Sequence, residues 1–157
     1  MKNLLIMRHG EPQRKYGLND FDLPLSDKGE KAAAKKGEII SGIGAVPDII
    51  LSSPAMRAKK TAELVAKSCG YEGEIIFHKS FYTNGCDSII TTIRELPDSI
   101  NRVLLIGHNP AWTDLVYALP SRHKMVLMNP ATLVALVFKG NAWRDIDSGK
   151  CVTEWVK

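Results

Sequence analysis

The stretch "LLIMRHGEP", residues 4–12, runs from apolar residues straight into an arginine, a histidine and a glycine. Residues 3–7 form a short, mostly apolar run, which predicts a buried strand. Arg8 and His9 follow at once, although neither side chain gains much from packing at that position. They are either the start of an ordinary polar loop or side chains that the strand holds in place for a function.

The same pattern follows two further predicted strands, residues 48–51 and 102–106. The first is followed by "SSPAMR", which ends on Arg57, and the second by "GHNP", which contains His108. If these strands are parallel, their carboxyl ends lie at one edge of the sheet, where ligands bind in folds of this kind. The sequence therefore predicts that Arg57 and His108 meet the first arginine–histidine pair at that edge.

The rest of the chain alternates between helical and strand patterns. Ser26 is a good N-cap for a helix that runs to about Ile40. Ser53 and Pro54 suit the start of a second helix, and Gly70 suits its end. Further elements are expected as a helix over 87–96 and as strands over 74–78, 132–138 and 151–156. This order predicts an α/β fold, a single three-layer α/β/α domain over residues 1–157 with a mainly parallel central sheet.

The composition narrows the class of protein. Hydrophobic residues make up 45% of the 157 and charged residues 24%, which is typical of a globular chain. No stretch approaches the roughly 20 apolar residues of a membrane span. Three widely spaced cysteines favour free thiols in a reducing, cytoplasmic setting. A net charge of +4 is modest for a nucleic-acid binder. We therefore expect no membrane and no nucleic acid as partner.

The residue types at the predicted edge suit a phosphoryl group. Arg57 falls on the first turn of its helix, where free backbone N–H groups also favour an anion. Two arginine forks match phosphate oxygens, and an imidazole beside them can attack phosphorus. Gly10 would let the backbone approach the ligand closely. No cluster has the spacing of metal ligands, so we expect neither a metal nor another cofactor.

Four segments carry a resemblance to a known family, and they occur in order along most of the chain: "LLIMRHGEP", "PLSDKGEKAA", "LSSPAMRAKKTAE" and "VLLIGHNP". They resemble the signature segments of the histidine phosphatase (phosphoglycerate-mutase-like) superfamily, and within it those of SixA-type phosphohistidine phosphatases. The resemblance implies that His9 accepts the phosphoryl group and that Arg8, Arg57 and His108 bind it. Gly10 and Asn109 would lie beside the phosphate, in a pocket that works without a metal.

The sequence departs from the family at the position expected for a proton donor. Many small relatives have a glutamate directly after the tyrosine of the segment that reads "FYTNGCDS" here, residues 81–88, but this chain has Thr83. Asp87 is the nearest carboxylate and the candidate general acid. An aspartate at the start of a predicted helix is also a common N-cap. The identity of the acid stays open between these interpretations.

The resemblance and the pocket chemistry together predict a phosphatase that works through a phosphohistidine intermediate. The expected substrate is a phosphohistidine on a partner protein, because the chain lacks the acidic insertion of the mutases and would leave an open site. One alternative is a phosphatase or mutase for a small phosphorylated molecule. The other is a phosphate-binding module without catalytic activity.

Overall fold

The computed structural model describes residues 1–157, except for the side chain of Thr153. The strands are β1 (Lys2–Arg8), β2 (Ile49–Ser52), β3 (Ile75–Phe77), β4 (Arg102–Gly107), β5 (Leu133–Phe138) and β6 (Cys151–Val156). The α-helices are α1 (Asp27–Gly42), α2 (Met56–Cys69), α3 (Ser80–Thr83), α4 (Cys86–Arg94) and α5 (Ala111–Ala118). Three short 3-10 helices complete the fold: η1 (Asp20–Asp22), η2 (Trp143–Asp145) and η3 (Ser148–Lys150).

The strands form one six-stranded sheet in the order β3-β2-β4-β1-β5-β6. The first four of these strands are parallel, whereas β5 runs antiparallel to both β1 and β6. In the register, Arg8 lies opposite Gly107 and Ser52 lies opposite Ile106. The carboxyl ends of β1, β2 and β4 therefore share one edge of the sheet, as the sequence predicts.

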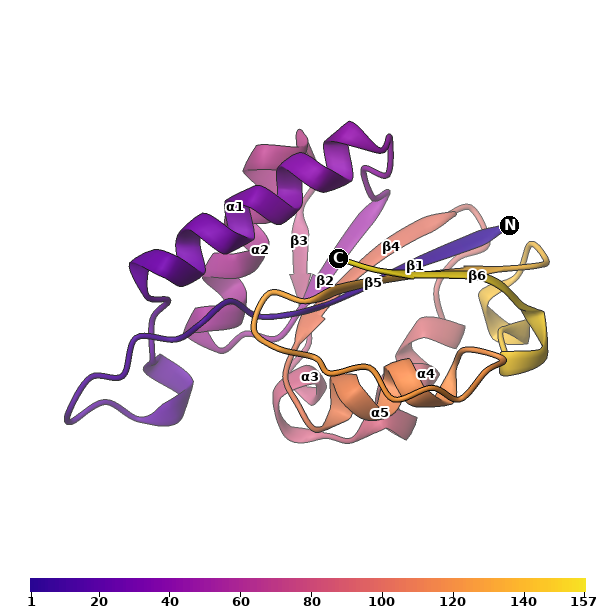
Figure 1. Ribbon diagram of the computed structural model, residues 1–157. Helices are drawn as coiled ribbons and strands as arrows, with labels where there is room; N and C mark the ends of the chain where they lie inside the picture. Colours follow the sequence, from indigo (N-terminus) through magenta and orange to yellow (C-terminus); the bar gives the residue numbers. More distant parts are fainter.

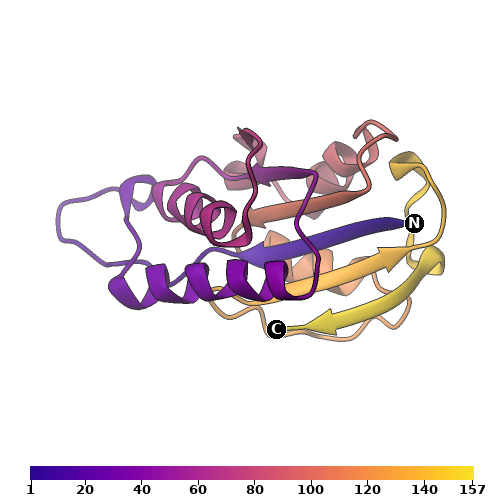
Figure 2. The same ribbon diagram turned by 90° about the horizontal axis from the view of Figure 1, so that it is seen from above.

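Helices cover both faces of the sheet (Figure 1), which confirms the predicted α/β fold. α1 and α2 lie over one face, while α3, α4 and α5 lie under the other. Viewed from above, β6 lies at the margin of the sheet, beyond the cover of α1 (Figure 2). Each face buries its own apolar cluster, because alternate side chains of a strand point to opposite faces. Leu4 and Ile6 belong to one cluster, and Leu5 and Met7 to the other.

The start of α1 packs tightly against the segment that leaves β1. Ser26 caps the helix by accepting a hydrogen bond from the backbone N–H of Gly29 at 3.0 Å, as predicted. A Cβ atom on Gly10 would lie 2.8 Å from the carbonyl oxygen of Gly29, and one on Gly29 would clash with that of Glu11. Both positions need glycine because the two backbones are nearly in contact.

Two local predictions need correction. The helix expected to begin at Pro54 begins at Met56, with Ala55 as an N-cap that makes no side-chain bond. Ser53 does not cap it directly, because its hydroxyl accepts the N–H of Ala55 and contacts a histidine. The short helix α3 was not expected from the sequence. Its four residues are too few for a helical periodicity to be recognised.

None of the helices in the described chain is both long and apolar enough to cross a membrane.

Candidate active site

Four predicted residues meet at the carboxyl ends of the strands. Arg8 is the last residue of β1 and His9 follows it. His108 follows β4, and Arg57 is the second residue of α2. The rings of the two histidines have centroids 4.9 Å apart. Arg57 donates from Nε to Nε2 of His9 at 3.3 Å. Because β1 and β4 are neighbours in the sheet, the register of two parallel strands brings these side chains together.

A small cavity opens beside them, with a volume of about 210 Å³. We call it the strand-end cavity, and its lining residues are Arg8, His9, Pro12, Arg14, Asp20, Leu23 and Arg57. His9 is 4% exposed, whereas the side chain of Asp20 is 63% exposed. The cavity therefore has a buried base at His9 and a solvent-facing mouth at Asp20.

The hydrogen bonds of His9 determine where its proton lies. Nδ1 is 2.6 Å from the carbonyl oxygen of Gly10, and a carbonyl can only accept. Nδ1 therefore carries the proton, and Nε2 presents a lone pair to Arg57. Burial, together with the charges of Arg57 and Arg8, lowers the pKa of His9 to about 4. The ring is thus neutral at neutral pH and nucleophilic at Nε2.

His108 is oriented by the segment that follows β2. Its Nε2 lies 2.7 Å from the hydroxyl oxygen of Ser53. Its Nδ1 is buried and has no hydrogen-bond partner among the described residues. Burial first, and then the neighbouring His9 and Arg57, lower the pKa of His108 to about 3. A second neutral imidazole therefore lies beside the nucleophile.

The two arginines supply the positive charge. Arg57 donates from Nη1 to the carbonyl oxygen of Asp20 at 2.6 Å, and from Nη2 to the Asp20 carboxylate at 3.0 Å. Arg8 donates from Nη1 to the carbonyl oxygen of Met128 at 2.9 Å, and its buried Nε has no partner in the described chain. Burial and Arg57 lower the pKa of Arg8. Together with Arg14, which also lines the cavity, these two arginines outnumber its one carboxylate and favour an anionic ligand.

Two of the predicted phosphate contacts have other partners in this structure. The N–H of Gly10 donates to the hydroxyl of Thr61 at 3.0 Å, so this glycine serves the packing of α1 and α2. Asn109 donates its amide to the carbonyl oxygen of Met128 at 3.0 Å and accepts from Thr113. The Met128 carbonyl also binds Arg8, so Asn109 helps to position that arginine.

Asp87, the candidate acid, is not among the residues of the strand-end cavity. It lies in the first turn of α4, where a carboxylate suits the helix dipole. It lines a different hollow of about 540 Å³, together with Asn84 and Asp114. The N-cap of α4 is Gly85, so Asp87 is not the cap either.

Sequence reasoning missed Asp20, which lines the mouth of the cavity, and Tyr82, which binds its carboxylate. The phenol of Tyr82 donates to the Asp20 carboxylate at 2.8 Å, and its ring packs edge-on against His108 at 5.4 Å. The sequence offers only a weak signal for Asp20, an aspartate just before the predicted helix that Ser26 caps. Its partners Arg57 and Tyr82 are 37 and 62 residues away, so no local pattern indicates the contact.

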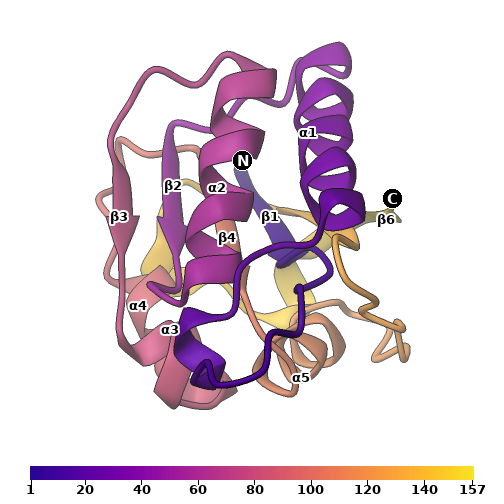
Figure 3. The ribbon, with the colours of Figure 1, turned by 90° about the vertical axis from the view of Figure 1, so that its left-hand side faces the viewer.

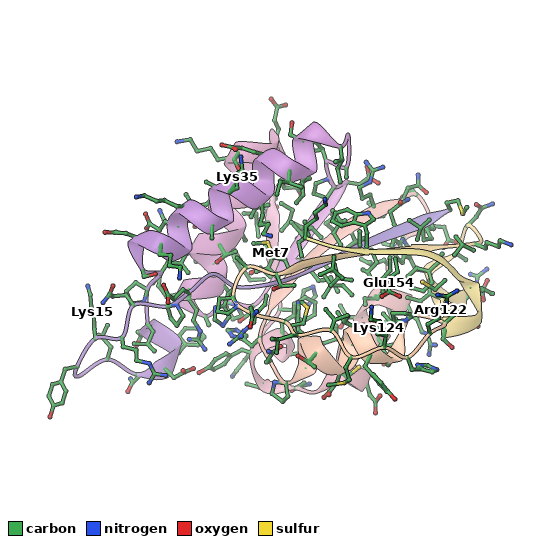
Figure 4. All side chains as sticks on the ribbon, in the orientation of Figure 1. Met7, Lys15, Lys35, Arg122, Lys124 and Glu154 are labelled. Atoms are coloured by element: carbon green, nitrogen blue, oxygen red, sulfur yellow. The ribbon has the colours of Figure 1, made fainter. Side chains whose placement is uncertain are left out.

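Other charged groups lie away from this site (Figure 4). Lys15 lies on the protruding loop before η1, whereas Arg122, Lys124 and Glu154 lie at the opposite end of the molecule. The last three line a separate hollow of about 430 Å³. Within the described residues, no group of three or more His, Cys, Asp or Glu side chains is placed to hold a metal ion.

Comparisons with known proteins agree with this fold. The sequence model of the histidine phosphatase superfamily (branch 1) matches residues 4–81. An uncharacterised chloroplastic protein of Arabidopsis thaliana is 32% identical over 157 residues, which cover 92% of this chain and 70% of that protein. A 2,3-bisphosphoglycerate-dependent phosphoglycerate mutase of Streptomyces avermitilis is 33% identical over 84 residues, which cover 52% of this chain and 33% of the mutase.

Among solved structures, the protein histidine phosphatase SixA complexed with tungstate is similar, with a TM-score of 0.85 and 19% identity. The match covers 98% of this chain and 95% of that one. The sequence match, together with the fold, supports an enzyme of the phosphatase and mutase class. The chain belongs to the histidine phosphatase superfamily.

Proposed function

We propose that this protein hydrolyses phosphohistidine on partner proteins, without a metal ion, through a covalent phosphohistidine at His9. The observation that carries the proposal is the state of His9. Its Nδ1 proton is held by the carbonyl of Gly10, and its neutral Nε2 faces Arg57 beside the cavity. A buried imidazole in this tautomer can attack phosphorus without first losing a proton.

The positive groups around His9 would bind and activate the phosphoryl group. Arg8 and Arg57 would neutralise its charge, and His108 would contact it from the second strand end. The unpartnered Nε of Arg8 and Nδ1 of His108 support these roles, because each is a buried polar atom with bonding capacity to spare. Phosphoryl transfer depends mostly on such positioning and charge stabilisation. Asn109 and Gly10 would act indirectly, by holding Arg8 and the backbone.

The reaction would proceed in two steps. The Nε2 lone pair of His9 attacks phosphorus while the bond to the leaving nitrogen breaks. The departing imidazole keeps the electron pair of the broken bond and takes up a proton from solvent. Water then attacks phosphorus from the mouth of the cavity, and the P–Nε2 bond returns its electrons to His9. Inorganic phosphate leaves, and the enzyme is restored.

The size of the cavity supports a substrate that stays mostly outside it. Pockets for small ligands typically enclose about 300–1,000 Å³, whereas the strand-end cavity encloses about 210 Å³. It has room for a phosphoryl group and little more, so the remainder of the substrate would rest on the protein surface. The similar structure named as a protein histidine phosphatase, with its bound tungstate, supports a tetrahedral oxyanion on such a fold.

The test compares two kinds of substrate under identical conditions. We expect kcat/KM for a phosphohistidine protein or peptide to exceed that for an alkyl phosphate by about 10²-fold or more, because no strong acid serves an ester leaving group. Activity should survive a strong chelator, and vanadate should inhibit it. A protein that hydrolyses one small phosphate ester efficiently and ignores phosphohistidine would contradict the proposal.

The match to a phosphoglycerate mutase favours a small phosphorylated molecule as the second candidate substrate. A panel of sugar, acid and nucleoside phosphates distinguishes it from the first. A phosphate-binding module without activity would show no label on His9 after incubation with any phosphoryl donor.

A further inference from the structure

A single carboxylate of the described chain lines the strand-end cavity, that of Asp20. It belongs to η1, and its side chain is 63% exposed. Oδ2 accepts from Arg57 Nη2 at 3.0 Å and from the Tyr82 hydroxyl at 2.8 Å. No role follows for it from the sequence, and the nucleophilic step described above does not use it.

The position of Asp20 coincides with the side from which water must come. His9 lies at the buried base, and Nε2 would hold the phosphorus atom. In-line displacement requires the attacking water to approach phosphorus from the opposite side, which is the solvent-facing mouth. Asp20 lies at that mouth, so its carboxylate is within the region that the water must cross.

Arg57 can hold Asp20 and a phosphoryl group at the same time. A guanidinium has five N–H bonds, and two of them bind the carbonyl and carboxylate oxygens of Asp20. A third, from Nε, binds the lone pair of His9 Nε2. Once that lone pair is bonded to phosphorus, the Nε–H and the second Nη2–H are free for phosphoryl oxygens. Binding of the phosphoryl group therefore leaves Asp20 attached to Arg57.

Tyr82 binds the same carboxylate independently of Arg57. Its ring lies edge-on to Phe21, the next residue of η1, with centroids 5.1 Å apart, and edge-on to His108. The hydroxyl donates to Oδ2 of Asp20. An exposed carboxylate that is bound on two sides by residues of α2 and α3 is thus oriented despite its exposure.

We propose that Asp20 is the general base that activates water for hydrolysis of the phosphohistidine intermediate, with Tyr82 as a positioning residue. The carboxylate takes a proton from the attacking water as the water oxygen bonds to phosphorus. The P–Nε2 bond breaks, and its electron pair returns to His9. The Asp20 carboxyl then releases its proton to solvent. This inference rests on the proposed function and deepens it.

The charge state of Asp20 agrees with a base. Hydrogen bonds from Tyr82 and Arg57, and the neighbouring His108, lower the pKa of Asp20 although partial desolvation opposes them. The titratable and charged groups that face it are Arg57, Tyr82, His108, His9, Arg8 and Arg14. The carboxylate is therefore ionised at neutral pH, ready to accept a proton.

The same ionisation has a consequence for substrate choice. An ester leaving group departs from the position that the water later occupies, so it would need the protonated form of Asp20. That form is scarce at neutral pH. A phosphohistidine leaving group takes its proton from solvent and makes no such demand. A base with a low pKa therefore favours phosphoramidates over alkyl esters.

The test measures formation and breakdown of the phosphoenzyme separately, by rapid quench with labelled phosphoramidate as the donor. In Asp20→Asn we expect breakdown to slow by about 10²-fold or more, while formation changes by less than about tenfold. Labelled His9 should therefore accumulate. Asp22→Asn is the matched control, since it removes the same charge from the same 3-10 helix, and it should behave as wild type.

Tyr82→Phe tests the positioning role. It keeps the ring packing and removes only the hydroxyl, so breakdown should slow less than in Asp20→Asn and formation should stay unchanged. In the wild type, breakdown should also slow at a pH below the range in which carboxyl groups usually titrate, because Asp20 is then protonated. This decrease at low pH should be missing in Asp20→Asn. A structural role would change formation and breakdown together and would leave the pH profile in place.

Two results overturn the proposal: unchanged breakdown in Asp20→Asn, or equal loss in formation and breakdown. Failure of the proposed function looks different. A wild type that is labelled by phosphoramidate but ignores phosphohistidine proteins contradicts the protein substrate, and the Asp20 comparison still stands. A wild type that forms no phosphoenzyme contradicts both.

Discussion

The base and the mouth of the strand-end cavity are built in different ways. At the base of the cavity lies His9, which directly follows a core strand, and His108 lies beside it after the neighbouring strand; the two are 4% and 9% exposed. The mouth carries Asp20 on η1, whose carboxylate accepts a hydrogen bond from Tyr82 on α3, and both of these short elements lie outside the sheet. The segment that carries η1 crosses in front of the sheet edge and approaches α3 (Figure 3). In the proposed reaction, nucleophilic attack thus depends on residues at the ends of core strands, and activation of the water depends on surface segments.

The largest expected effect comes from His9, the nucleophile at the base of the cavity. His9→Ala removes the nucleophile, so it should abolish the acid-labile phosphoenzyme and reduce turnover by about 10⁴-fold or more. Labelling and steady-state assays measure this directly, and thermal unfolding checks that the variant is folded. His123→Ala, at an exposed position, is the matched control. Full labelling of the His9→Ala protein would show that the nucleophile has been assigned to the wrong residue.

A smaller effect is expected from Arg57, because this side chain contacts residues at both the base and the mouth of the cavity. Arg57 bonds to both His9 and Asp20 through separate nitrogens, and lysine has no such fork. Arg57→Lys should lower kcat/KM by about 10²–10³-fold and weaken vanadate inhibition. Lys59→Arg, on the same helix, should leave both unchanged. Wild-type activity in Arg57→Lys would mean that positive charge alone is sufficient.

The pH dependence of phosphoenzyme formation distinguishes the buried His9 from an ordinary exposed histidine. The folded pKa of His9 is about 4, below the usual value of about 6.5, so its lone pair stays available as the pH falls through that value. Phosphoenzyme formation, measured with a donor that remains dianionic, should change by less than about twofold between roughly pH 8 and pH 5.5. It should then fall as the pH approaches 4 and the proton occupies Nε2. An inflection near the usual histidine pKa would contradict the buried, neutral state.

The smallest effect is expected away from both regions. Asp87 lines a separate hollow in the first turn of α4, so Asp87→Asn should change kcat/KM by less than about twofold. Assays with a phosphohistidine peptide and with an alkyl phosphate check this for both leaving groups. A large loss on the alkyl ester alone would restore Asp87 as the acid and would place a second carboxylate at the mouth.

Several features of this protein follow from the sequence by itself. Apolar runs that stop at "RHG" and "GHNP" indicate two buried strands with functional ends, and β1 and β4 are neighbours with aligned carboxyl ends. The caps at Ser26 and Gly70 are local as well, because a cap depends only on residues within one turn. The convergence of His9, His108 and the two arginines could therefore be predicted, since parallel strands allow few other arrangements.

The tertiary structure decided which carboxylate lies at the site. Asp20 and Asp87 are both aspartates near a helix start, and no local pattern separates them. Asp20 is selected because η1 packs against α2 and α3, through contacts with residues 37 and 62 positions away. The sequence likewise does not reveal that the missing side chain of Gly10 is required by the close approach of α1. Short-range hydrogen bonding and periodicity specify the strands and helices, but the packing of connecting segments depends on contacts that exist only once the sheet has formed.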